Sequence, residues 1–388
     1  MARKGGPSGA RKGAKSRVDS KAQDDAELED TLGTIDDSLV VDRSDLRSAR
    51  FGSSSTGSMS ASSATMDGPD DDDDLMGFAA SEGGIVGTCT EMCPEAERYE
   101  RERDRDLSVF EIIPGTGSAA VGDTPRVDHA RAVKKYKRAA AAKHINPATV
   151  RTEPVLIRTL QYLLREVVDR EDYPYHEVFK FVSDRLRALR KDFDCQRIVS
   201  ASFTRALECI IRFHILSGYE LVDAALENFS AKQNVTAATG SLTTLFHQYK
   251  DGITSPNEAE FRAYALMYTV DTADFSTALY KLSPTIQQSE PIRAVRRVYN
   301  CLRYQNWTQL WREIQQLPYL LSCILVPKLA KLRGAMFVCM LQAYKRGELP
   351  VEEVARALLL SEDDATVLAI SKVRIRDASY ATLSNCHF

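Results

Sequence analysis

The residues best placed to do chemistry are two cysteines that precede a charged segment, Cys89 and Cys93. Their C-x3-C spacing suits a pair of metal-binding thiolates, but a structural zinc site needs four ligands. No second pair at a matching distance follows, because Cys195 and Cys209 are too far apart in the sequence to form one. We therefore expect no metal, and we favour packing of both thiols, with Met92, as small hydrophobic groups against a helical body.

A charged helix is expected directly after these cysteines. Pro94 can start it, since proline at the first helical position lacks an N–H that would be unsatisfied there anyway. In the sequence EAERYERERDRDLSVFE, Glu97 and Arg101 are four residues apart, as are Arg98 and Glu102. This pattern predicts a mostly solvated helix whose ion pairs contribute only a few tenths of a kcal/mol each. The cysteine segment would then anchor the start of the domain, with the charged helix lying across the helical body.

A second charged segment, PRVDHARAVKKYKRAAAAKH, contains seven basic residues and one acid, Asp128. As a helix, it would place Val133, Tyr136 and Ala140 on one apolar stripe with the cations around them. Sequence-independent binding of nucleic acid needs such a positive surface. The candidate residues are Arg131, Lys134, Lys135, Lys137, Arg138 and Lys143. Two alternatives stay open: the lysines could be merely solvated, or the segment could bind an acidic protein partner.

Residue patterns typical of catalysis are missing from the sequence. It has no P-loop, nucleophile elbow, HExxH or dinucleotide-binding pattern. The six histidines are scattered. His214 falls on the apolar face of an expected helix, which favours a buried histidine bonded to a carbonyl over a metal ligand. We therefore expect neither enzymatic activity nor a cofactor.

Charge is segregated along the 388 residues, although the net charge is only -3. Residues 1–84 are rich in Ser, Gly, Ala and Asp and contain just two aromatic residues. Such a segment cannot bury enough apolar area to offset its ordering entropy, so we expect a disordered low-complexity tail. Its basic start is either a nuclear import signal or a solvated tail. The basic residues there are Arg3, Lys4, Arg11, Lys12, Lys15 and Arg17.

The cellular compartment is constrained by what the sequence lacks. No run of about 18 uncharged apolar residues is present, so no membrane span is expected. The basic N-terminal residues are not followed by an apolar core, so a secretory signal is not expected either. The eight cysteines lie mostly within apolar helical patterns, which indicates reduced thiols in the cytosol or nucleus.

From residue 126 to about 345, apolar residues recur every three or four positions, as in helices with one buried face. Leu156, Leu160 and Leu163 belong to the clearest stripe. Asn257 with Glu260 resembles a capping pair that opens a helix. Helices of roughly 10 to 20 residues, separated by Gly, Pro and Ser breaks, predict an all-α, TPR-like solenoid of irregular helical pairs.

The last segment, residues 346–388, follows a different pattern. Two short helices, the second capped near Ser361, would open a winged helix. The sequence that follows, SKVRIRDASYATLSNCHF, offers one or two short strands at most. We therefore expect a partial or divergent winged helix at this end.

Three motifs resemble one known family. GTCTEMCPEAERYERE resembles the opening motif of the germinal-centre-associated nuclear protein family, also called the leucine permease transcriptional regulator family. The matching residues are Cys89, Met92, Cys93, Pro94, Glu97, Arg98 and Arg101. AVKKYKRAAAA is similar to the second motif, and SLTTLFHQYK with NEAEFRAYALMY is similar to the third. The matching residues of this third motif are Glu260, Phe261, Arg262 and Tyr264.

The resemblance covers about residues 85–372 and predicts the organisation of the chain. Residues 85–125 would be the opening motif and a linker, residues 126–345 the helical solenoid, and residues 346–388 the winged-helix-like end. This arrangement is of the PCI type found in subunits of the proteasome lid and of an initiation factor.

The resemblance also implies a function. Family members look like scaffolds rather than enzymes, and the best-known ones hold together the second transcription-export complex, which links transcribed genes to nuclear pores and mRNA export. The implied partners are a second PCI-type subunit, a small acidic subunit, RNA and, indirectly, nuclear pore proteins, all in the nucleus. The long extensions of large members are not present, so we expect a core domain only. Some small members are tied to centrosomes, which leaves a centrosomal or spindle-associated adaptor as the alternative, with a cytoplasmic or centrosomal pool.

Overall fold

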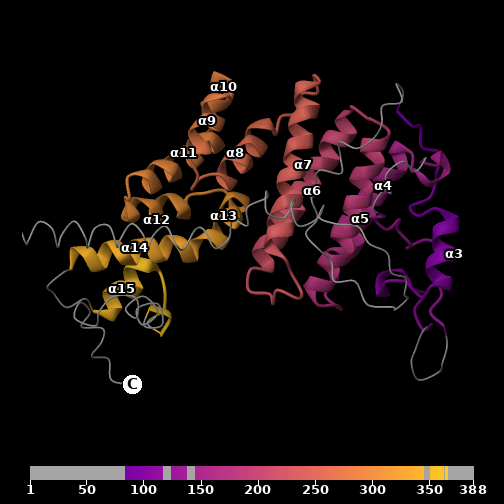
Figure 1. Ribbon diagram of the computed structural model, residues 1–388, viewed down its shortest axis with the longest axis horizontal. Coiled ribbons are helices and arrows are strands. Elements are labelled where there is room, and N and C mark those ends of the chain that lie inside the picture. Colours follow the sequence, from indigo (N-terminus) through magenta and orange to yellow (C-terminus); the bar gives the residue numbers. More distant parts are fainter. Residues whose placement is uncertain (1–83, 117–123, 138–144, 345–349, 362, 366–388) are drawn as a thin grey trace, which may run out of the picture. The chain divides into compact units, whose positions relative to one another are not determined.

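The structure, a computed structural model, describes residues 84–116, 124–137, 145–344, 350–361 and 363–365 (Figure 1). These residues all belong to one unit, Pro69–Phe388. Within them, extended pairing is limited to two isolated bridges, Cys89 with Arg151 and Ile112 with Val127. The remainder of the regular structure is helical, which confirms the expected all-α class. No helix in this described part of the chain is long and apolar enough to cross a membrane.

The helices follow one another along the chain with short connections. In order they are α3 (Glu95–Arg103), the 3-10 turns Val109–Glu111 and Pro147–Thr149, α4 (Glu153–Tyr162) continued by a π-helical turn (Leu163–Val167), α5 (Tyr175–Cys195), α6 (Ala201–Glu220), α7 (Ala231–Lys250), α8 (Glu258–Tyr268), α9 (Asp274–Tyr280), α10 (Pro284–Gln287), α11 (Glu290–Arg303), α12 (Trp307–Gln315), α13 (Tyr319–Leu325), a 3-10 turn (Val326–Lys328), α14 (Leu329–Ala343) and α15 (Val351–Leu358).

Sequential helices pack as pairs, as the apolar periodicity predicts. α4 packs on α5, α5 on α6 and α6 on α7, and α6 and α7 form the most extensive pair (Figure 1). Both of these long helices begin at a serine cap: Ser200 Oγ accepts from the Phe203 amide, and Ser230 Oγ accepts from the Gln233 amide. The order of packing then becomes irregular, because α13 returns to contact both α6 and α8.

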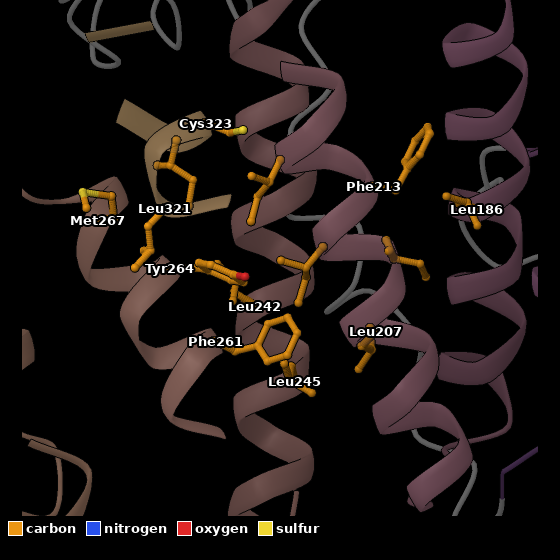
Figure 2. Close-up of a cluster of buried hydrophobic side chains, with 14 of the residues drawn as sticks. Leu186, Leu207, Phe213, Leu242, Leu245, Phe261, Tyr264, Met267, Leu321 and Cys323 are labelled. Atoms are coloured by element: carbon orange, nitrogen blue, oxygen red, sulfur yellow. The ribbon is translucent and has the colours of Figure 1, made fainter. Parts of the chain in front are cut away.

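The core between α6, α7 and α8 is built around Phe261, whose side chain is fully buried. Figure 2 shows Phe261 and Tyr264 of α8 beside Leu242 and Leu245 of α7. The guanidinium of Arg212 lies over the Phe261 ring, 4.8 Å from its centre. The aromatic ring therefore has both apolar neighbours and a cation against its face, which adds to the stabilisation from burial.

The polar residues of the third motif hold α8 in this core. Glu260 accepts two hydrogen bonds from Arg212 of α6, at 2.9 and 2.8 Å, and a third from the Tyr264 hydroxyl at 2.5 Å. Arg262 lies 3.9 Å from the centre of the Phe246 ring of α7. The motif residues Glu260, Phe261, Arg262 and Tyr264 thus have packing roles.

The expected cap at the start of α8 is wrong. Asn257 occupies the cap position, but its side chain makes no capping hydrogen bond. It donates instead to the buried carboxylate of Glu208 at 2.8 Å, beside Ser255 Oγ at 2.6 Å. A buried carboxylate without donors is costly, and satisfying Glu208 takes the Asn257 side chain away from the helix end.

His214 is a buried core histidine, as predicted. Its Nδ1 lies 2.8 Å from the side-chain oxygen of Asn234, and the Asn234 amide donates to the His214 backbone carbonyl at 2.9 Å. Burial lowers the pKa of His214 to about 4, so the ring is neutral at physiological pH. The residue therefore ties α6 to α7 rather than binding a ligand.

A second, smaller core lies at the end of the described chain, where Met336 and Phe337 of α14 pack with Val354 and Leu358 of α15. Ser361 Oγ accepts from the Asp364 amide at 3.1 Å, which caps the start of the second short helix as predicted. The expected strands fall at residues 366–388, outside the described residues, so the winged helix stays a prediction. The predicted tail, residues 1–84, lies outside the described residues except for Gly84, so it also stays a prediction, as do the domain boundaries.

Phe261→Ala should lower the free energy of unfolding by about 3–5 kcal/mol, because it removes a fully buried ring and leaves a cavity. Urea denaturation followed by circular dichroism measures this change. Tyr304→Ala is the matched control, since Tyr304 is 79% exposed and its loss should leave stability unchanged. Equal midpoints for the two variants would contradict the placement of the core.

Candidate functional site

A buried cluster of ionised side chains lies where α3 meets residues 124–137 and helix α5. At its centre is the fully buried carboxylate of Glu111. One carboxylate oxygen accepts from Arg101 of α3 at 2.7 Å and from Arg185 of α5 at 3.0 Å. The other oxygen accepts from the Val133 amide at 2.9 Å. One carboxylate therefore joins three segments that are far apart in the sequence.

Arg101 connects this carboxylate to the cysteine motif. It is only 2% exposed, and it donates to Cys93 Sγ at 3.3 Å and to the Val133 carbonyl at 3.2 Å. The predicted pair with Glu97 is present at 3.6 Å, but it is buried instead of solvated. The charged helix is thus not the exposed element that alternating charges predicted.

Helix α3 is also shorter than predicted, and hydrogen bonds attach it to residues 124–137. It ends at Arg103, and Arg105 then takes a left-handed conformation with φ 57°. Glu97 accepts from the Lys135 amide at 2.8 Å, and Arg98 donates to the His129 carbonyl at 3.3 Å. These contacts bury Glu97 and Arg98, because their partners come from a segment about 30 residues away along the chain, which local charge pairing cannot reveal.

A second ionic group fixes the cysteine motif to α5. Asp192 accepts from Lys134 Nζ at 2.6 Å and from Arg151 Nε at 2.8 Å, and Arg151 is fully buried. The Met92 carbonyl accepts from the Lys134 amide at 3.0 Å. The Cys89 amide donates to the Val150 carbonyl at 3.0 Å. The expectation that this motif anchors the start of the domain agrees with these contacts.

Gly87 is required by close contact between backbones. A Cβ atom at this position would lie 2.7 Å from the Val150 carbonyl oxygen. The Gly87 amide donates to the side chain of Gln196 at 3.0 Å, at the end of α5. The segment that precedes Cys89 is therefore already in contact with the helical body.

The cluster keeps the Glu111 carboxylate charged and the Cys93 thiol neutral. Burial alone would raise the pKa of Glu111, but the charges of Arg185 and Arg101, with hydrogen bonds from Arg101 and the Val133 amide, bring it below its ordinary value. Burial raises the pKa of the Cys93 thiol to about 12. A thiol that stays protonated at neutral pH is neither a good metal ligand nor a nucleophile.

The helix predicted for the basic segment is wrong over its described residues. Residues 124–137 contain a turn, one isolated bridge at Val127 and otherwise irregular backbone. The amides of Val133, Lys135 and Tyr136 donate to the carboxylates of Glu111, Glu97 and Asp184. Since a helix would use these amides within itself, the acidic side chains of neighbouring elements keep the segment out of a helix.

The cations of this segment are largely paired. Lys134 is 17% exposed and bonded to Asp192. Lys135 lies 2.9 Å from Asp106, and Lys137 lies 2.7 Å from Glu100. Arg131 pairs with Asp128 at 3.5 Å. Arg138 and Lys143 lie outside the described residues, and contact of this segment with nucleic acid stays a prediction.

Sequence reasoning missed the partners on α5. Arg185 and Asp192 follow the buried Val178 by seven and fourteen residues, so they fall on the same helical face. Charged residues on an apolar face indicate buried ion pairs, and this signal was available. Glu111 and Arg151 lie outside regular α-helices, where no periodicity marks them.

The cluster fits a structural role. In the part of the chain that the structure describes, no group of three or more His, Cys, Asp or Glu residues could hold a metal ion. The ionised groups face one another, so each charge is neutralised by a partner in the fold. The fold and this cluster together define an all-helical repeat domain whose first segment is fastened to its body by buried ion pairs.

The chain belongs to the SAC3/GANP family, whose model matches residues 92–376. It is 30% identical over 325 residues to "Protein xmas" of Drosophila melanogaster, covering 79% of this chain and 15% of that protein. It is 32% identical over 306 residues to "SAC3 family protein B" of Arabidopsis thaliana, covering 73% and 17%. "SAC3 family protein 1" of Schizosaccharomyces pombe is 39% identical over 189 residues, covering 47% and 17%. The chain therefore spans less than a fifth of the length of these relatives.

Glu111→Gln should lower the free energy of unfolding by about 3 kcal/mol, because it removes the buried charge that Arg101 and Arg185 share and leaves each arginine with only its second carboxylate, Glu97 or Asp184. Urea denaturation measures the loss. Glu100→Gln is the matched control, since it removes the same charge from an exposed pair with Lys137 and should change stability little. Similar values for the two variants would show that the cluster does not hold the fold.

The stability difference between the native protein and Glu111→Gln should depend on pH. The pKa of Glu111 is lowered in the folded state, so its contribution is complete above its unfolded pKa of about 4.3. This contribution is lost as the pH falls through the lower folded value. Denaturation of both proteins between pH 7 and pH 3 should show the difference shrinking, whereas the titration of His214 is common to both and cancels. A difference that stays constant below pH 4 would contradict this assignment.

Proposed function

We propose that this chain is a non-enzymatic scaffold subunit of a transcription-export type complex and supports mRNA export from the nucleus. The observation that carries the proposal is membership of the SAC3/GANP family over residues 92–376. The matched range includes the ionic cluster around Glu111, so the family's unit contains the fastened first segment as well as the solenoid.

The internal use of charge supports a scaffold. A scaffold must hold its surfaces in fixed positions, and the Glu111 and Asp192 groups fix α3, residues 124–137 and α5 to one another. Buried ion pairs specify one arrangement of segments, because any other leaves a charge without a partner. This rigidity suits a protein that positions other subunits.

The proposed partners are a second PCI-type subunit, a small acidic subunit and RNA, with nuclear pore proteins bound indirectly. Pairing with the PCI-type subunit is assigned to residues 346–388, which include α15. Localisation is proposed to be nuclear and associated with the pore. A centrosomal or spindle-associated adaptor, with a cytoplasmic or centrosomal pool, is the competing function, and the same experiment separates the two.

Affinity purification of the tagged chain from its own cells, followed by mass spectrometry, should recover a second PCI protein, a small acidic protein and pore proteins. The physical reason is that a scaffold stays bound to its subunits at physiological salt. Glu111→Gln, which loses the buried ion pairs with Arg101 and Arg185, should recover less of these subunits than Glu100→Gln expressed at the same level. Recovery of tubulin-associated or centrosomal proteins without those subunits would overturn the export function and favour the adaptor.

A further inference from the structure

An exposed basic face on α11 stands apart from the cluster around Glu111. Arg293, Arg296, Asn300 and Arg303 are separated by three, four and three residues, so they lie on one side of the helix. All four are exposed, whereas the opposite side of α11 is buried in the core. We call these four residues the α11 arginine face.

The α11 arginine face has few acids near it in the sequence. From Lys281 through Arg312, both included, there are six basic residues and one acidic residue, Glu290. Glu290 lies 3.0 Å from Arg293 and 3.1 Å from Arg297, and Arg297 is also paired with Glu313. Among the described residues, Arg296 and Arg303 form no ion pair. This differs from residues 124–137, whose cations are paired within the fold.

A surface hollow lies at one end of this face. It has a volume of about 430 Å³ and is lined by Pro284, Gln287, Gln288, Arg293 and Arg296. Two guanidinium groups and two side-chain amides supply several hydrogen-bond donors to one open site. Apolar residues dominate the pockets of small-molecule ligands, so this lining fits an anionic group such as a phosphate held at the surface.

Exposed tyrosines lie close to the same helix. Tyr304 follows Arg303 directly and is 79% exposed, and Tyr280 at the end of α9 is 78% exposed. Phe275 of α9 stacks on Tyr299 of α11, with ring centres 4.0 Å apart, so the two helices pack together. Aromatic side chains beside a basic surface are the elements on which unpaired bases stack. An acidic peptide would use the arginines but would leave the tyrosines without a partner.

We propose that the α11 arginine face, together with Tyr304, binds single-stranded RNA through its phosphates and one stacked base. Arg293 and Arg303 are ten residues apart, which corresponds to about 15 Å along a helix, enough for a few nucleotides. The choice of RNA rests on the proposed function, whereas the location of the site rests on the exposed charge. The site shares no residue with the candidate nucleic-acid-binding residues of the basic segment.

Fluorescence anisotropy with a labelled, unstructured RNA of about 20 nucleotides tests this site on the purified full chain. The triple variant Arg293→Glu, Arg296→Glu and Arg303→Glu should bind at least tenfold more weakly. Its slope of log affinity against log salt should be shallower by about 2, because three phosphate contacts are lost. Tyr304→Ala should weaken binding about tenfold with the slope unchanged, since stacking releases no counterions.

The matched control is Lys180→Glu, Lys232→Glu and Lys250→Glu, which reverses three exposed lysines of α5 and α7 that belong to no candidate site. An equal loss of affinity in both triple variants would show that only overall charge matters and would overturn the proposal. Unchanged RNA affinity in the α11 variant, with loss of an acidic protein from the purified complex, would also overturn it and assign the face to that protein. Thermal unfolding of each variant checks that it is folded.

The two proposals fail separately. If the α11 variant loses RNA but the tagged native chain recovers none of the export subunits, the RNA site stands and the export function fails. If the export subunits are recovered and the α11 variant binds RNA normally, the export function stands and the RNA site fails.

Discussion

The sharing of one buried carboxylate between two arginines is the interaction on which the first part of this fold depends. Glu111 has no access to water, so its charge is stable only where Arg101 and Arg185 both reach it. Arg101 belongs to α3 and Arg185 to α5, and the Val133 amide brings in a third segment. Moving any of these segments would remove a hydrogen bond from the buried Glu111 carboxylate.

The need to neutralise buried charge also explains why residues 124–137 and α11, both rich in basic residues, differ in how many of their cations are paired within the fold. The cations of residues 124–137 lie among the acids of α3 and α5, so Lys134, Lys135 and Lys137 are neutralised within the fold. α11 contributes its apolar side to the core and has one acid, Glu290, among its own residues, which pairs with Arg293 and Arg297. Among the described residues, Arg296 and Arg303 of the same helix are exposed and have no ion pair. The number of basic residues in a segment therefore says little about its availability to a partner until the positions of the acids are known.

Membership of the SAC3/GANP family gives these features a common setting. The matched residues begin at Met92 and so include α3, the ionic cluster and the solenoid. Residues of the family motifs have partners within the fold. Cys93 and Glu97 contact Arg101, Glu260 bonds to Arg212 of α6, and Arg262 packs on Phe246 of α7. These motif residues therefore stabilise the packing of the domain, and we expect partners to bind on its exposed faces.

The sequence by itself determined the all-α class and the buried stripes, because a period of 3.6 residues is a local property of the chain. It also placed His214 in the core and the cysteine motif against the body. Only the tertiary structure decided which charges are buried: α3 looked solvated by its local pattern, yet Glu97 and Arg101 have partners about 30 residues away in the sequence. In the tertiary structure, turns and irregular backbone also replace the expected basic helix. The Asn257 side chain bonds to Glu208 instead of capping α8. In each case, a long-range carboxylate needed donors that local propensity had assigned elsewhere.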